Sequence, residues 1–238
     1  MESQRLDKIL ASTGKYSRKE ARGLIRAGRV LADGVPVRDA AAKLDAEAVH
    51  ISVDGADIAC RRVTWVMLNK PAGYLSATED RRAPTVLDLL PPELRHLFPV
   101  GRLDKDTVGL LLLTDDGATA HALLSPRHHV EKVYMARVSG RLTDADAAAF
   151  REGVTLSDGL RCLPAGLEIL SADDAESLCR VTVQEGKFHQ VRRMLAGRGK
   201  PVLFLERVKM GNLPLDETLG RGSFRFLTAE EIENLRVF

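Results

Sequence analysis

The sequence has little of several features that define specialised classes of protein. Its three cysteines, Cys60, Cys162 and Cys179, are far apart and form no CxxC pair. They argue against a structural zinc site and a secreted disulfide framework, and they fit a reducing compartment best. No segment approaches the roughly 20 apolar residues that span a bilayer, and the charged N-terminus lacks the apolar stretch of a secretory signal. We therefore expect a soluble, cytoplasmic protein.

Common cofactor motifs are also missing. Neither GxxxxGK(S/T) nor GxGxxG occurs, which argues against a nucleotide-dependent enzyme, and there is no HExxH motif. His128 and His129 are adjacent and precede Glu131, but neighbouring residues of a strand point to opposite faces and rarely bind one ion. We expect neither a metal site nor a cofactor.

Two properties of the composition point to a folded protein with a charged end. The 238 residues are 45% hydrophobic, enough for a substantial core in one large domain or two smaller ones. The formal net charge is only +2, yet the first 30 residues contain eight basic and three acidic side chains. The positive charge is concentrated at the N-terminus.

The first 60 residues have the pattern of a small helical and β-hairpin module. Apolar residues recur at helical spacing from Leu6 and again from Ala21, and Ser17 with Glu20 forms a capping-box pattern before the second helix. A basic ridge is expected on the side of this helix away from its apolar stripe. The ridge comprises Arg18, Arg22, Arg26 and Arg29. Asp33 and Gly34 predict a tight turn between two strands, and 50–55 predicts another strand.

The remainder of the chain has a different pattern. Residues 54–62 are polar and weakly patterned, so we predict a domain boundary near Arg61, with domains at 1–61 and 62–238. Strand-like segments then adjoin one another as often as they adjoin helices, which favours an α+β fold with a mixed, mostly antiparallel sheet. The predicted strands lie within 63–71, 109–114, 130–140, 176–186 and 200–211. The predicted helices lie within 85–90, 116–125, 143–153, 189–199 and 228–235.

The N-terminal module resembles the S4 RNA-binding domain. The matching stretches are RLDKIL, YSRKEARGLIRAGRVLADGVPV and HISVDG. In that family the second helix and the following turn face RNA. The resemblance therefore implies RNA contacts by Arg5, Lys8, Arg18, Lys19, Arg22 and Arg29. Arginine suits such a surface because its guanidinium binds phosphate in a bidentate manner and stacks on bases. Without the resemblance, the ridge would be read as the solvated side of an amphipathic helix.

Three further motifs together resemble the RsuA-type pseudouridine synthases, which isomerise uridine in structured RNA. They are LNKPAGYLSAT at 68–78, GRLDKDTVGLLLLTDDG at 101–117 and EGKFHQVRRM at 185–194, the last followed by LERVKMGNLPL. The resemblance runs from about Val63 to the C-terminus. It implies an enzyme that needs no cofactor or metal.

This resemblance assigns the essential carboxylate to Asp104. An arbitrary aspartate before an apolar run is more often a solvated or capping residue, and Asp106, Asp115 and Asp116 in the same stretch do not match the catalytic position. Uridine isomerisation breaks the N1–C1′ bond and joins C5 to C1′, and a carboxylate can act as nucleophile or stabilise positive charge on the sugar. The sequence leaves attack at the sugar, attack at the base and proton abstraction from the sugar open.

The other expected site residues follow from the same motifs. Arg192 is implied as the ion-pair partner that keeps Asp104 ionised, with Arg193 as the alternative. Tyr134 is implied to stack on the uracil, and Leu205 to lie beneath it. The target nucleotide must leave its stack, and Arg102 is implied to hold it there. Lys70 and Lys187 are candidates for contacts with the RNA backbone.

We therefore expect an isomerase that acts on ribosomal RNA as a monomer and away from membranes. The closest resemblance implies 16S RNA of an assembling small subunit, at uridine 516. Two alternatives stay open: an enzyme of the same family acting on 23S RNA, and a non-catalytic RNA-binding assembly factor with the same fold.

Overall fold

The computed structural model describes residues 3–13, 15–45, 49–58 and 63–235, and it divides into two compact units, Met1–Val63 and Thr64–Phe238. The predicted boundary near Arg61 and the cysteine at position 60 lie outside the described residues. Each unit has its own apolar core.

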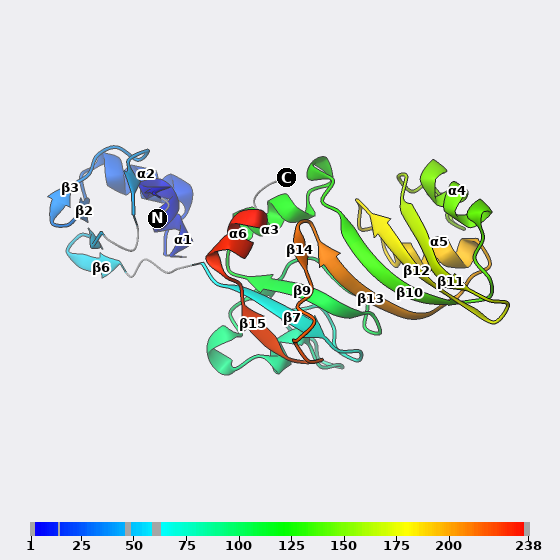
Figure 1. Ribbon diagram of the computed structural model, residues 1–238. Helices are drawn as coiled ribbons and strands as arrows, with labels where there is room; N and C mark the ends of the chain where they lie inside the picture. The colour runs from blue at the N-terminus through cyan, green and yellow to red at the C-terminus, as the bar shows by residue number, and fades with distance from the viewer. Residues whose placement is uncertain (1–2, 14, 46–48, 59–62, 236–238) are drawn as a thin grey trace. The chain divides into compact units, whose positions relative to one another are not determined.

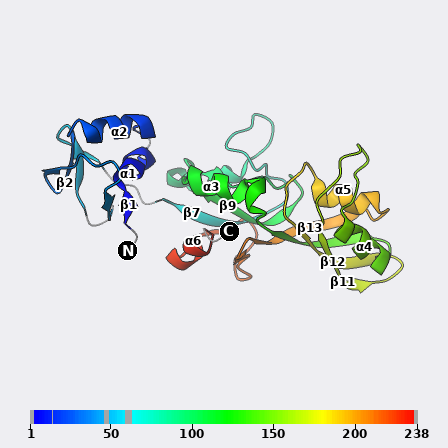
Figure 2. The ribbon, with the colours of Figure 1, turned by 90° about the horizontal axis from the view of Figure 1, so that it is seen from above.

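The small unit consists of two helices and short strands. Helix α1 spans Leu6–Ser12 and packs on α2, Arg18–Arg26 (Figure 2). The Ser17 side chain accepts a hydrogen bond from the Glu20 amide and the Glu20 carboxylate accepts one from the Ser17 amide, so the predicted capping box is confirmed. Leu6, Ile9 and Leu10 of α1 are buried against Ala21 and Ile25 of α2. The helices share this core with Val30, Ile51, Val53 and Ile58 of the strands.

The predicted hairpin is confirmed. Strands β2 (Val30–Ala32) and β3 (Val35–Pro36) pair across Asp33 and Gly34, which both have positive φ as a two-residue turn requires. The four-stranded sheet has the order β3-β2-β5-β6, with β5 at Ile51–Val53 and β6 at Ala56–Ile58. Strand β6 lies in the stretch that we read as weakly patterned. Strands β1 (Gln4–Arg5) and β4 (Lys43–Leu44) form a separate pair.

Arg29 does not belong to the helix, contrary to the predicted ridge. Helix α2 ends at Arg26, and Gly28 has a φ of 72°, which turns the chain out of the helix. Arg29 precedes β2 and pairs with Asp54. The helical part of the ridge is therefore limited to Arg18, Arg22 and Arg26.

The large unit is built on one mixed sheet with the order β11-β12-β10-β13-β9-β7-β15, in which β8 also pairs with β9 and β14 with β13 (Figure 1). The β13–β9 pair is parallel and the other described pairs are antiparallel, as predicted. The strands are β7 (Trp65–Lys70), β8 (Phe98–Pro99), β9 (Val108–Thr114), β10 (Lys132–Ser139), β11 (Gly166–Ala172), β12 (Glu176–Val183), β13 (Val202–Met210), β14 (Leu213–Pro214) and β15 (Phe224–Phe226).

Four α-helices accompany this sheet: α3 (Gly117–Leu124), α4 (Asp144–Glu152), α5 (Gln190–Gly197) and α6 (Ala229–Leu235). The predicted helix at 85–90 is instead a single 3-10 turn, η1 (Val86–Leu89), and two more such turns are η2 (Pro92–Leu94) and η3 (Pro126–His128). His128 and His129 therefore lie in a turn and not on a strand, with His129 at a φ of 48°.

Among the described residues, one apolar cluster lies toward each end of the large sheet, and the two meet at Tyr134. One packs α4 and α5 against β10–β13, and the other packs η1 and η2 against β7 and β9. All seven residues of β9 are buried, so the leucine run anchors the loop that precedes it. Gly109 has a φ of 99°, and a Cβ there would lie 2.3 Å from the carbonyl oxygen of Arg207. Glycine at this position therefore lets β13 run beside β9.

Candidate active site

A small cleft lies where the two cores of the large unit meet. Its walls come from the loop before β9, from β10 and β13, and from the turn that leads into α5. Five residues predicted for the site line it: Arg102, Asp104, Tyr134, Lys187 and Leu205. The three motifs are distant in the sequence, and the fold brings parts of two of them to one place.

The loop that carries Asp104 is held by its main chain. The Lys70 ammonium donates hydrogen bonds to the carbonyl oxygens of Asp104 at 3.1 Å, Lys105 at 3.2 Å and Thr107 at 2.9 Å. The Ser76 hydroxyl donates to the carbonyl of Leu103 and accepts from its amide, both at 3.0 Å. These contacts hold the backbone on both sides of Asp104 without using its carboxylate.

Among the described residues, the carboxylate of Asp104 makes only long contacts. The Thr107 hydroxyl lies 3.4 Å from its Oδ2, the Arg192 Nε lies 3.6 Å from the same oxygen, and the His189 Nε2 lies 3.5 Å from Oδ1. Its side chain is 26% exposed. The carboxylate therefore keeps lone pairs available to a molecule that enters the cleft.

Arg192 is shared between two acids. The predicted ion pair with Asp104 is present, but Nη2 of Arg192 is closer to Asp106, at 2.9 Å. The Nε of Arg192 is buried and has no hydrogen-bond partner within the described part of the chain. This nitrogen is the atom that forms the ion pair with Asp104, at a distance beyond hydrogen-bonding range. The alternative partner, Arg193, pairs instead with Asp158.

Tyr134 and Leu205 come from neighbouring strands and line the same cleft. Leu205 is 3% exposed within the core beneath α4 and α5, and Tyr134 is half-buried against both cores of the large unit. An aromatic ring and an aliphatic side chain at this point provide an apolar surface opposite a carboxylate. A flat, partly polar ring would find both kinds of contact there.

The prediction that Lys70 contacts the RNA backbone is wrong for this structure. The residue is fully buried at the end of β7, and its ammonium is occupied by four carbonyl oxygens, including that of Pro71. Burial lowers the pKa of Lys70 to about 8, while the charges of Asp106 and Asp104 oppose this shift. Lys70 acts on the loop and not on a ligand.

The remaining basic residues of the cleft differ in their availability. Arg102 is exposed at the cleft. Lys187 pairs with Glu185 and donates to the carbonyl of Arg161 at 3.2 Å. Its side chain is 25% exposed, so it reaches solvent while it is paired. Of these two cations, Arg102 is the more accessible to an anionic ligand.

In the small unit, three of the predicted RNA-binding residues surround one buried acid. Asp7 is fully buried and lies 3.0 Å from Arg5, 2.8 Å from Arg22 and 3.9 Å from Arg18. The hydrogen bond from Arg5 is the main reason that the pKa of Asp7 falls to about 2, and Arg22 contributes in the same direction. The three arginines remain about half exposed, so each still presents donors to solvent.

The other three residues predicted to bind RNA do not pair with Asp7. Lys19 is exposed on α2, Lys8 is half-buried on α1, and neither forms an ion pair within the described residues. Arg29 lies on the turn before β2 and pairs with the exposed Asp54. The predicted RNA-binding residues therefore occupy the end of β1, the helices α1 and α2, and the turn before β2.

Sequence reasoning missed His189, Thr107 and Ser76. His189 and Thr107 lie inside two of the motifs that we matched, and both line the cleft. Their proximity to the carboxylate could have been suspected from the motifs. Ser76 lies inside the first motif, at 68–78, but the motif does not signal that its hydroxyl bonds the backbone of Leu103, because the two residues meet only through the folding of the chain.

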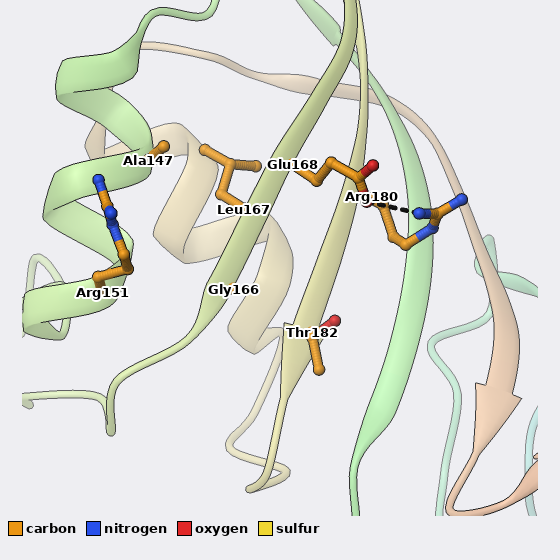
Figure 3. A pocket seen from close by; sticks show the side chains of 7 residues that line it. All are labelled: Ala147, Arg151, Gly166, Leu167, Glu168, Arg180 and Thr182. Carbon is orange, nitrogen blue, oxygen red and sulfur yellow. Dashed lines mark hydrogen bonds and ion pairs between the residues drawn. The ribbon is translucent and has the colours of Figure 1, made fainter.

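A larger hollow, of about 360 Å³, lies beside α4 at strands β11 and β12 (Figure 3). Glu168 and Arg180 on its wall form an ion pair with each other, and it contains none of the predicted site residues. No group of three or more histidine, cysteine or acidic side chains that could hold a metal occurs among the described residues. No helix in that same part of the chain is long and apolar enough to cross a membrane.

Comparison with known proteins places the chain in a family. The family model described as RNA pseudouridylate synthase matches residues 64–197, and the S4 domain model matches residues 4–50. A solved structure described as "Crystal structure of pseudouridylate synthase" is 37% identical and superposes with a TM-score of 0.69 over 98% of this chain and 100% of that one.

Two curated relatives match over nearly their whole length. The "Uncharacterized RNA pseudouridine synthase YtzG" of Bacillus subtilis (strain 168) is 43% identical, with 97% of this chain and 98% of the relative covered. The "Ribosomal small subunit pseudouridine synthase A" of Escherichia coli (strain K12) is 42% identical, with 97% and 99% covered. The fold is that of an RNA-modifying isomerase with an S4 domain, and the chain belongs to the RNA pseudouridine synthase family.

Proposed function

We propose that this protein converts one uridine of 16S ribosomal RNA to pseudouridine, with uridine 516 as the target. The observation that carries the proposal is Asp104, a partly exposed carboxylate held by its backbone in a cleft with Tyr134 and Leu205. The choice of RNA is supported by relatives named ribosomal small subunit pseudouridine synthase A, which match nearly the whole chain.

The proposed reaction is an isomerisation, so its atoms balance without an oxidant or water. The N1–C1′ bond breaks, the uracil turns, C5 bonds to C1′, C5 loses its proton and N1 gains one. A carboxylate at the sugar or the base can supply the negative charge or electron pair that this exchange needs. Arg192 forms an ion pair with Asp104 and carries the opposite charge at this point of the cleft. Attack at the sugar, attack at the base and proton abstraction from the sugar all remain compatible with this geometry.

The neighbouring side chains have proposed roles in binding the base and sugar. Tyr134 stacks on the uracil and is placed to assist proton removal from C5, and Leu205 supports the base from below. Arg102 holds the extruded nucleotide, and Lys187 contacts its backbone. The uridine must leave its stack to reach Asp104, and cations at the cleft offset the charge of the approaching phosphates.

We also propose a division of labour between two domains, residues 1–61 and 62–238. The first docks the RNA through Arg5, Lys8, Arg18, Lys19, Arg22 and Arg29. The second performs the reaction. All the proposed catalytic residues come from one chain, so a monomer suffices.

The test is a map of pseudouridine in ribosomal RNA from cells with and without this protein, restored with wild type or Asp104→Asn. We expect one 16S pseudouridine to disappear, to return with wild type and to stay absent with the variant. An unchanged pseudouridine map of 16S RNA, or a loss of pseudouridine confined to 23S RNA, would overturn the assignment of 16S RNA as the substrate. Restoration by Asp104→Asn would overturn the role of Asp104 and favour a non-catalytic assembly factor.

A further inference from the structure

Phe188 is the most exposed large hydrophobic side chain of the described residues, at 70%. It lies in the turn between β12 and α5, and its ring stacks on His189 with centroids 3.7 Å apart and planes inclined by 20°. Single exposed apolar residues are common on protein surfaces and need no explanation. This one is unusual because a second ring fixes its orientation.

The second ring belongs to the cleft. His189 lines it, and its Nε2 lies 3.5 Å from Oδ1 of Asp104. Its φ of 49° is in the left-handed region, which non-glycine residues adopt at a cost and which is often kept at functional sites. The stacked pair therefore extends from the proposed catalytic carboxylate to the exposed Phe188 ring.

The turn that carries this pair is held by hydrogen bonds on both sides. The Lys187 amide donates to Oε1 of Gln190 at 3.0 Å, and the Gln190 amide donates to the carbonyl of Lys187 at 3.1 Å. The amide of Arg193 in α5 donates to the carbonyl of His189 at 2.9 Å. A preorganised exposed ring loses less conformational freedom when it binds another flat group.

The cations that line the cleft with His189 indicate the kind of flat group. Arg102 and Lys187 lie on the cleft wall, so a ligand that extends from the cleft to Phe188 meets cations as well as an aromatic face. Nucleic-acid-binding surfaces combine positive charge for the backbone with aromatic rings for unpaired bases. Extrusion of a uridine also removes one stacking partner from each adjoining base.

We propose that Phe188, braced by His189, stacks on an unpaired RNA base next to the target uridine. This inference rests on the proposed function, because it needs the uridine in the cleft beside Asp104. Stacking of one base on an aromatic side chain corresponds to roughly a 5- to 100-fold effect on affinity. Phe188 then contributes to substrate binding, whereas Asp104 contributes to the chemical step.

The test is single-turnover pseudouridine formation on a 16S RNA fragment, measured against enzyme concentration for wild type, Phe188→Ala, Phe188→Leu and Phe188→Trp. We expect the half-saturating concentration to rise about 5- to 100-fold for the alanine and leucine variants and to be restored by tryptophan. The saturated rate should change much less. Thermal unfolding of each full-length variant checks that it is folded.

A second set of substrates locates the base. RNA fragments with an abasic nucleotide on either side of the target should weaken wild type at one position, and Phe188→Ala should cause no further loss on that RNA. Two results would overturn the stacking role of Phe188 and leave the proposed function intact. One is a wild-type half-saturating concentration for Phe188→Leu. The other is a further rise in this concentration for Phe188→Ala on both abasic RNAs. Wild type that forms no pseudouridine in 16S RNA would overturn the proposed function and the inference with it.

Discussion

Each of the two units holds an aspartate among basic residues, and the two clusters differ in how tightly the acid is engaged. In the small unit Asp7 is fully buried, with Arg5 and Arg22 at 2.8 to 3.0 Å. In the large unit Asp104 is 26% exposed, with His189 and Arg192 at 3.5 and 3.6 Å. The first acid is saturated by its partners, and the second is not.

The difference teaches how a carboxylate can be positioned and still remain available. Asp7 is positioned through its side chain, so its lone pairs are used to hold α1 to α2. Asp104 is positioned through its main chain, by Lys70 on its carbonyl and by Ser76 on the preceding residue. A reactive acid needs the second arrangement, because preorganisation must not consume the group that reacts.

The largest effect is expected from substitution of Asp104, which should lower the reaction rate and leave RNA affinity nearly unchanged. We expect Asp104→Asn to slow pseudouridine formation by at least about 1,000-fold, because an amide cannot take the place of a carboxylate in the chemical step. RNA affinity should stay within about twofold, since the phosphate contacts are unchanged. Single-turnover rates and filter binding measure the two effects. Asp7→Asn is the matched control, and an equal loss of rate in that variant would contradict the comparison.

Lys70 tests whether the backbone of the Asp104 loop is what the reaction depends on. Lys70→Met keeps a similar length but leaves buried carbonyls without a donor, so we expect a rate loss of roughly 100-fold and a loss of about 1–3 kcal/mol in the free energy of unfolding. RNA affinity should change little, because Lys70 is buried. Urea unfolding and single-turnover rates provide the readouts. A variant with normal rate and weak RNA binding would restore the original prediction of an RNA contact.

Asp7 should stabilise the protein in a way that depends on pH. Its pKa is lowered to about 2, so its contribution is fully present above the ordinary aspartate pKa near 4 and is lost as the pH falls toward 2. We expect Asp7→Asn to lower the free energy of unfolding by about 1–2 kcal/mol at pH 7, after allowance for the half-exposed arginines. Urea unfolding at pH 7, 5 and 3 should show the difference shrinking at the lowest pH. A constant difference would exclude titration of Asp7 as its source.

Asp106 should give the smallest effect, although it is the nearer partner of Arg192. Its side chain is 69% exposed, and exposed ion pairs contribute little to stability. We expect Asp106→Asn to change the rate by less than about fivefold and to leave thermal unfolding unaltered. Single-turnover rates of Asp106→Asn and Asp104→Asn, measured under the same conditions, test this difference. A loss as large as that of Asp104→Asn would mean that Arg192 is positioned chiefly by Asp106.

Local features of the fold were predictable because short segments determine them. The capping box of Ser17 and Glu20 and the turn at Asp33 and Gly34 involve neighbours in the chain, and both are present. Longer elements followed from hydrophobic pattern. The elements that the prediction missed are short or pair with strands that are distant in the sequence. Strand β15, for example, has three residues and pairs with β7 from the other end of the large unit.

The site was predictable only in part, for a related reason. Motifs selected Asp104, Arg192, Tyr134 and Leu205, and the fold brings them to one cleft or into contact with it. Burial is a property of the whole fold, so the motif could not indicate that Lys70 lies inside. The motif also could not indicate that Arg192 is shared between Asp104 and Asp106. Both ion pairs join α5 to the loop before β9, and these segments are distant in the sequence.

The amino-acid sequence by itself determined the family, the two kinds of module and the identity of the candidate carboxylate, because these depend on residue types at fixed local spacing. The tertiary structure alone decided what surrounds that carboxylate. It buries Lys70 beneath the loop and brings His189 within 3.5 Å of Asp104. It also leaves the Phe188 ring exposed and stacked on His189. The contacts of Lys70 and His189 with the Asp104 loop join residues separated by tens of positions, and only the packing of the sheet, loop and helix brings them within reach.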